Sequence, residues 1–218
     1  MTTDPTPRPA RSAGWSVRPG LAAAIAATAL GALLFGGAAS PVAAQGAGPN
    51  RTIAAYEVTF LEEMAHHHHM AVMMSMVCVE RAAELRPQLV ELCREIIETQ
   101  NRETAMMLSW LRSWYGISYS PHEDMGPEMM EMLAEMRAMP PAEFERFFLE
   151  DMIVHHAAAL QPARQCRGKA YHQELASMCR DIVEVQVDEI DLMRDWLCQW
   201  FGECHFHIDP HRRRAMHG

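Results

Sequence analysis

The sequence predicts an all-α fold in which two repeated helical hairpins pack as a four-helix bundle and a short Met-rich helix connects them. Three observations lead to this prediction. The chain repeats itself at an offset of 88 residues, apolar side chains recur at spacings of three and four, and prolines and glycines stand where helices would begin and end. Neither hairpin alone could bury its apolar stripe, so packing one hairpin against the other is the economical arrangement.

The first 44 residues are expected to be a signal peptide and not part of the fold. Arg8, Arg11 and Arg18 precede an apolar run at 21–39, and the small residues 42–44 form a cleavage motif. An uncleaved anchor is the alternative, because the run is nearly long enough to span a bilayer. Its many alanines and glycines favour cleavage. We therefore expect a periplasmic or secreted mature chain without membrane contact, whose residues 45–57 form a linker.

Composition excludes some classes of partner. The chain has 19 basic and 28 acidic residues and a formal charge of -9, whereas nucleic-acid binding requires basic surface. Hydrophobic residues make up 49% of the chain and charged residues 22%, as is ordinary for a folded globular protein. The 18 methionines and 12 histidines are the unusual feature, and they direct attention to metal ions.

The duplication relates residues 58–116 to residues 146–202. The matched residues, first copy then second, include Phe60 and Phe148, Met64 and Met152, His67 and His155, His68 and His156, Cys78 and Cys166, Cys93 and Cys179, Gln100 and Gln186, Glu103 and Glu189, and Met107 and Met193. Each copy holds two amphipathic stretches and ends at Gly116 or Gly202, where a glycine would terminate the second helix. Each copy is therefore expected to form one helical hairpin.

Residues 117–145 form a Met-rich connector between the copies, and residues 203–218 form a His-rich tail. Pro127 is placed to start a short helix in the connector, and Pro140 and Pro141 are placed to stop it. Five methionines recur there at spacings of four and three, namely Met125, Met129, Met132, Met136 and Met139. Such a stripe is more typical of packing than of a cofactor site, although these side chains could close over a nearby metal cluster.

The six cysteines are best interpreted as three disulfides, since export would place them in an oxidising compartment. The repeat selects one pairing among the 15 possible connectivities. It joins Cys78 with Cys93, Cys166 with Cys179, and Cys198 with Cys204. The alternative is a thiolate copper site, mainly at Cys204 beside His205 and His207.

A first group of candidate metal ligands recurs in both copies. Met152, His155 and His156 stand at positions i, i+3 and i+4 and point the same way from one helical turn. Glu189 and Met193 share an apolar face of the next helix, where an unpaired carboxylate would be costly. A histidine could satisfy that carboxylate and keep its other nitrogen for a metal. The alternative is a buried polar layer that only fixes the helix register. The same positions in the first copy are Met64, His67, His68, Glu103 and Met107.

A second group occurs in the first copy alone, on the opposite side of the same helix. It consists of His66, His69, Met70 and Met73, whose counterparts are Val154, Ala157, Ala158 and Gln161. Imidazole and thioether donors together suit Cu(I). The alternative is a Met-lined packing surface with incidental histidines. We expect this group to be the most accessible metal site.

The second copy carries a family resemblance. Its pattern Phe148-Leu149-x-x-Met152-x-x-His155-His156, followed by Gln186-x-x-Glu189-Ile190-x-x-Met193-x-x-Trp196-Leu197, resembles a bacterial domain-of-unknown-function family of duplicated His/Met helical hairpins. The resemblance covers residues 58–202 and implies a ferritin-like bundle. Because one periplasmic member of that family binds copper, it also implies binding of Cu(I), with Ag(I) as a further candidate. The cysteines of the hairpins are not part of the family pattern.

The expected function is that of an exported metal-binding protein, which sequesters Cu(I) or hands it to a copper-handling partner protein. One alternative is a non-catalytic structural or interaction bundle whose buried His and Glu only specify packing. Another is a metal-dependent redox enzyme. Ferritin-like di-iron sites need Glu-x-x-His on each of two helices, and only Glu63-x-x-His66 fits, since Val154 replaces the histidine in the second copy. This departure argues against a ferroxidase.

Overall fold

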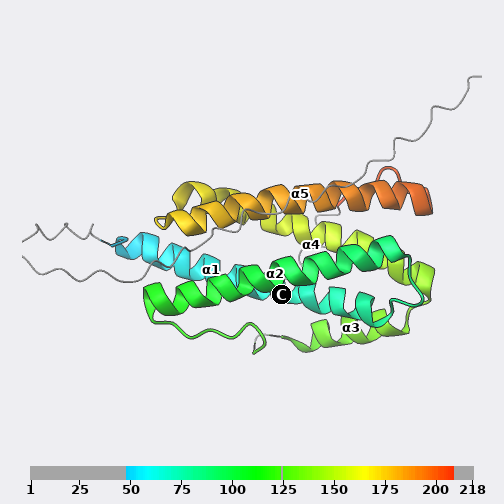
Figure 1. Ribbon diagram of the computed structural model, residues 1–218, viewed down its shortest axis with the longest axis horizontal. Helices are drawn as coiled ribbons and strands as arrows, with labels where there is room; N and C mark the ends of the chain where they lie inside the picture. The colour runs from blue at the N-terminus through cyan, green and yellow to red at the C-terminus, as the bar shows by residue number, and fades with distance from the viewer. Residues whose placement is uncertain (1–47, 124, 209–218) are drawn as a thin grey trace, which may run out of the picture. The chain divides into compact units, whose positions relative to one another are not determined.

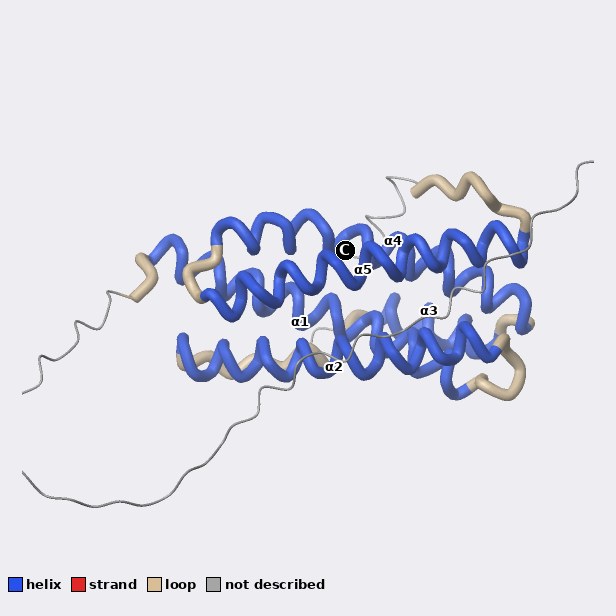
Figure 2. Tube along the Cα trace, turned by 45° about the horizontal axis from the view of Figure 1, so that its top comes forward, coloured by secondary structure: helices blue, strands red, loops and turns tan. Residues whose placement is uncertain are grey.

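The computed structural model describes residues 48–123 and 125–208 of the chain. Its helices are α1 (Arg51–Glu80), α2 (Pro87–Tyr115), α3 (Pro127–Ala138), α4 (Pro141–Lys169) and α5 (Gln173–Phe201). Within this described part the fold has helices and loops but no strand, as Figure 2 shows. The expected signal peptide, residues 45–47 and the end of the tail from residue 209 lie outside it.

Two antiparallel hairpins form the bundle. α1 packs against α2, α4 packs against α5, and contacts between α1 and α4 join the two hairpins (Figure 1). α3 lies against α1. The predicted four-helix bundle with a short connecting helix is confirmed. None of the described helices combines the length and the apolar character that crossing a bilayer demands.

The ends of the helices follow local sequence signals, and two of them differ from expectation. The side chain of Asn50 accepts a hydrogen bond from the N–H of Ile53 at 2.9 Å, so α1 begins at Arg51 and takes up residues 51–57, which we expected to be a linker. Pro141 is the first residue of α4, since proline suits the first helical turn. The expected connector 117–145 therefore contains the start of α4. Gly116 and Gly202 end α2 and α5 with φ of 69° and 74°, as predicted.

The core consists of two apolar clusters that lie at successive levels along the helices. The first includes Val77, Leu89, Ile96, Leu133, Phe144, Phe148 and Leu197, and the second includes Phe60, Leu61, Leu111, Ala163, Leu175 and Ile182. The methionine stripe of the connector belongs to the first cluster: Met136 is fully buried in it, and the other four methionines pack against it. The stripe therefore serves packing.

All three predicted disulfides are present. Cys78–Cys93 joins α1 to α2, and Cys166–Cys179 joins α4 to α5. Their Cα–Cα distances are 6.4 and 6.0 Å. Cys198–Cys204 closes the chain just after α5. Because Cys204 is oxidised in this pair, the structure does not support a thiolate copper site there.

Two buried glutamates tie the hairpins together at opposite ends of the bundle. Glu145 on α4 accepts hydrogen bonds from the backbone N–H and the guanidinium of Arg86, the residue that precedes α2. Glu57 on α1 accepts hydrogen bonds from the backbone N–H groups of Tyr171 and His172, just before α5. Each carboxylate thus caps the N-terminus of a helix in the other hairpin. The two glutamates are related by the repeat offset of 88 residues, which is the signal in the sequence that marks them.

Candidate metal centre

A layer of buried polar side chains separates the two apolar clusters. On each of the four long helices, these residues fall between those of the first cluster and those of the second. They are His67, His68, Gln100, Glu103, His155, His156, Gln186 and Glu189, all at most 8% exposed. The structure therefore brings together the inner candidate residues of both copies in the middle of the bundle.

A histidine and a glutamate form a hydrogen-bonded dyad within each hairpin. Nε2 of His68 lies 2.8 Å from Oε2 of Glu103, and Nε2 of His156 lies 2.6 Å from Oε2 of Glu189. Both imidazoles are fully buried. Because an ionised carboxylate only accepts hydrogen bonds, Nε2 carries the proton and Nδ1 keeps a lone pair in the neutral ring. Neither Nδ1 has a hydrogen-bond partner among the described residues. The predicted pairing of histidine with the Gln/Glu helix is confirmed.

His67 and His155 join the two dyads across the contact between α1 and α4. Their rings stack with a centroid distance of 3.7 Å and an interplanar angle of 37°. Nε2 of His67 also donates a hydrogen bond to the backbone carbonyl of His155 at 3.1 Å. Within each copy, the neighbouring imidazole centroids are 6.3 and 6.2 Å apart. The four histidines thus form one continuous cluster.

Thioethers flank this cluster on both sides. Met64 stands one helical turn before His68, and Met107 stands one turn after Glu103, so each shares a helix face with its polar neighbour. Met64 and Met107 belong to the second apolar cluster, whereas their counterparts Met152 and Met193 belong to the first. All four are buried. A thioether sulfur from each of the four long helices therefore borders the polar layer.

The donor set of this region is selective. In residues 48–123 and 125–208, no three His, Cys, Asp or Glu side chains are grouped so that they could hold a metal ion. The thioethers that border the polar layer are donors that suit soft monovalent ions better than hard or borderline divalent ones.

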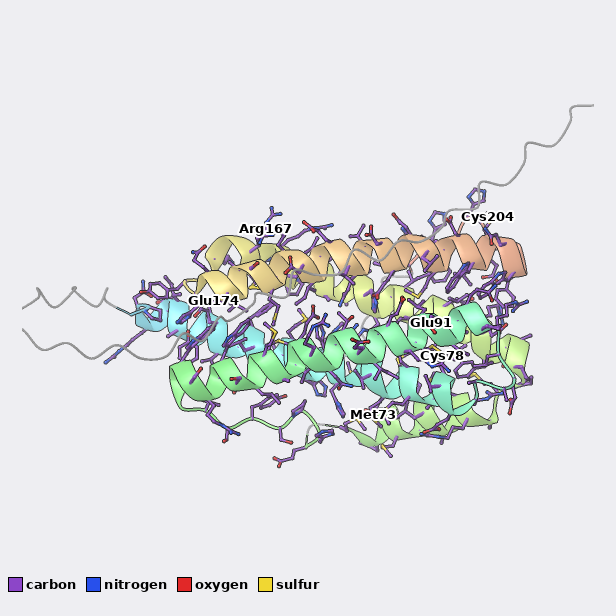
Figure 3. All side chains as sticks on the ribbon, viewed as in Figure 1. Met73, Cys78, Glu91, Arg167, Glu174 and Cys204 are labelled. Atoms are coloured by element: carbon purple, nitrogen blue, oxygen red, sulfur yellow. A yellow bond between two sulfur atoms is a disulfide. The ribbon has the colours of Figure 1, made fainter. Side chains whose placement is uncertain are left out.

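The second candidate group is more enclosed than expected. His69 and Met70 are buried, while His66 and Met73 are partly exposed. Met73, labelled in Figure 3, packs against the first apolar cluster. The connector contributes to the burial of His69, because the ring of His122 lies edge-on to that of His69 with a centroid distance of 4.1 Å. His122 was not among the residues predicted from the sequence, and its one signal there was its place beside the Met-rich helix.

Electrostatics keep His69 uncharged. Burial lowers the pKa of His69, and the neighbouring imidazoles of His122 and His66 lower it further. At neutral pH His69 is therefore in the form that can donate a nitrogen lone pair to a metal. By contrast, His205 and His207 of the tail are exposed.

Solved structures of CopM are similar to this chain. CopM in the Cu(I)-bound form shares 27% sequence identity at a TM-score of 0.59, over 67% of this chain and 98% of CopM. CopM in an Ag-bound form obtained by soaking shares 27% identity at a TM-score of 0.57, over 67% of this chain and 97% of CopM. A DUF305 protein from Streptomyces coelicolor has a TM-score of 0.58 at 23% identity, over 71% of this chain and 98% of the other, which shows the fold alone.

Sequence comparisons give the family. No curated protein matches the chain. The profile of DUF305, a domain of unknown function, matches residues 57–197, which include both hairpins and the connector. The family expected from the His/Met pattern is thereby confirmed: this chain belongs to the DUF305 family.

Proposed function

We propose that this protein binds Cu(I) and Ag(I) outside the cytoplasm and either sequesters the ion or hands it to a partner protein. The observation that carries the proposal is the repeated His–Glu dyad, in which Nδ1 of a fully buried imidazole has no hydrogen-bond donor within residues 48–123 and 125–208. Leaving a buried polar atom unsatisfied costs about 1–3 kcal/mol. A bound ion would remove that cost at His68 and at His156.

The residues of the polar layer divide into ligands and supports. His68 with Met64 and Met107, and His156 with Met152 and Met193, are the proposed ligands of one ion per hairpin. His67 and His155 lie close enough to their neighbours to add a further nitrogen. Glu103 and Glu189 act through the imidazoles: each accepts the Nε2 proton, which fixes the tautomer and the ring orientation.

The disulfides, the shared fold and the buried thioethers support this assignment. Three disulfides suit an oxidising compartment, in agreement with the expected signal peptide. The CopM structures with Cu(I) and Ag have the same fold at 27% identity. The buried thioethers beside the dyads supply the soft donors that monovalent ions prefer.

The test uses mature protein purified without a His-affinity tag. Changing His68→Gln and His156→Gln together keeps an N–H that can donate to each glutamate but removes the imidazole nitrogens. We expect this variant to fold and to lose most of its Cu(I) and Ag(I) binding in competition titrations, whereas the exposed tail variant His207→Gln should bind as wild type.

A structural role for the layer is the second candidate, because each dyad already forms a complete hydrogen bond within the protein. In that case the double variant would lose stability and leave Cu(I) stoichiometry and affinity unchanged. That result would return the dyads to the role of fixing helix register.

A further inference from the structure

The second candidate group, which contains His66 and His69 on α1, has a feature that the dyads do not explain. Nε2 of His69 and Nδ1 of His66 are both buried and have no hydrogen-bond partner among the described residues. The side chain of His69 is only 7% exposed. The two residues are three positions apart, so they project from neighbouring turns of one helix face. Two imidazole nitrogens are thus buried without a hydrogen-bond partner in the part of the chain that the structure describes.

The connector brings a third imidazole to this place. His122 is exposed, and its ring meets that of His69 edge-on at 4.1 Å with an interplanar angle of 75°. Two thioethers are also near by helical register, since Met70 follows His66 by one turn and Met73 follows His69 by one turn. Imidazoles from two separate segments therefore meet here, and the two thioethers stand on the same side of α1 as the histidines they follow.

We propose that His122 joins His66 and His69 to form a second monovalent metal site, in which Met70 or Met73 completes the donor set. The inference rests on the proposed function, because it assigns another site for the same class of ion. Cu(I) and Ag(I) need only two or three donors, so the site does not require a ready-made group of three His, Cys, Asp or Glu side chains. Among the named residues, His122, one of the two α1 histidines and one thioether already supply such a set, and the second α1 histidine can add a further donor.

This site differs from the inner dyads in two ways. It belongs to the first copy alone, because Val154 and Ala157 replace the two α1 histidines in the second copy. It also links two segments, so an ion bound there would fasten the connector around His122 to α1. The inner ligands lie on the paired helices of the hairpins, and binding there leaves the connector unchanged.

The experiment compares His122→Ala with the tail variant His207→Ala, since both remove an exposed imidazole. Ag(I) binding is measured by competition titration and native mass spectrometry, and protection of the connector by amide hydrogen exchange with and without Ag(I). We expect His122→Ala to lose about one Ag(I) per chain, or to weaken that ion at least about tenfold, and to lose the Ag(I)-dependent protection of residues 117–123. His207→Ala should retain both.

Equal stoichiometry, affinity and connector protection in His122→Ala and wild type would overturn this inference while leaving the inner sites untouched. The double variant His68→Gln/His156→Gln separates the two proposals. If it still binds an Ag(I) ion that the added His122→Ala change removes, the outer site stands even where the inner one fails. If wild-type protein binds no Ag(I), both proposals fail.

Discussion

Glu57, near the start of α1, forms two hydrogen bonds with His172, the residue that precedes α5. The backbone N–H of His172 lies 3.0 Å from Oε1 of Glu57, and Nδ1 of its ring lies 2.7 Å from Oε2. The imidazole also stacks on Trp114 at a centroid distance of 3.7 Å. At the opposite end of the bundle, Arg86 makes the equivalent contacts with a glutamate and a tryptophan. One end is therefore held by an imidazole and the other by a guanidinium.

The first prediction concerns stability in acid. Burial alone would raise the pKa of Glu57, but hydrogen bonds from Tyr115, His172 and Tyr171 outweigh it and hold the pKa below its ordinary value of 4.5. A carboxyl group with a lowered pKa stabilises the fold above its ordinary pKa, and this contribution is lost as the pH falls through the lowered value. Urea unfolding between pH 7 and pH 3 should therefore show a loss of stability that Glu57→Gln makes shallower. An identical pH profile for the variant would contradict this account.

The second prediction concerns the strength of the same contact at neutral pH. Glu57→Gln removes a buried charge that accepts several hydrogen bonds, so the free energy of unfolding should fall by about 1.5–3 kcal/mol. Tyr115→Phe removes only the hydroxyl that donates to Glu57, and the second copy already has Phe201 at that position. We expect Tyr115→Phe to cost about 1 kcal/mol and to raise the pKa of Glu57. Equal stability of Tyr115→Phe and wild type in urea unfolding would count against this hydrogen bond.

The third prediction concerns the hairpin disulfides. Replacing Cys78 and Cys93 together by alanine reopens a loop with a sequence separation of 15, so the free energy of unfolding should fall by about 3 kcal/mol. The pair Cys198 and Cys204 closes a loop with a separation of only 6 and should contribute less. Chemical denaturation of the two double variants measures the difference, and peptide mapping without reductant checks the pairing. A disulfide between the two hairpins would contradict the predicted pairing.

The fourth prediction separates ligand methionines from packing methionines. Changing Met70→Leu and Met73→Leu together nearly preserves side-chain volume, so stability should change by less than about 1.5 kcal/mol while Ag(I) affinity falls. Met132→Leu and Met136→Leu form the matched control in the connector stripe, where the side chains serve the first apolar cluster. The control should bind Ag(I) as wild type. If both double variants bind equally well, the thioethers of α1 have no part in binding.

Much of the architecture could be predicted because its signals are local or repeated. The helical period, the glycines after α2 and α5 and the offset between the copies are properties of the chain itself. The repeat also indicated that the inner histidines and glutamates face the bundle interior, because His68 and Glu103 recur in the second copy as His156 and Glu189, and it suggested that a histidine could satisfy each carboxylate. The repeat likewise selected the two hairpin disulfides, which left Cys198 to pair with Cys204.

The sequence by itself therefore determined the two hairpins and their disulfides, and it identified the histidines and glutamates from which the dyads are built. Only the tertiary structure decided which segments meet. The ring of His67 stacks on that of His155, Glu57 is hydrogen-bonded to His172 just before α5, and the ring of His122 lies edge-on to that of His69. Periodicity shows which side of a helix is buried but not which element covers it. That choice depends on how one hairpin packs against the other and on the path of the connector, since these place side chains from distant parts of the chain within contact distance.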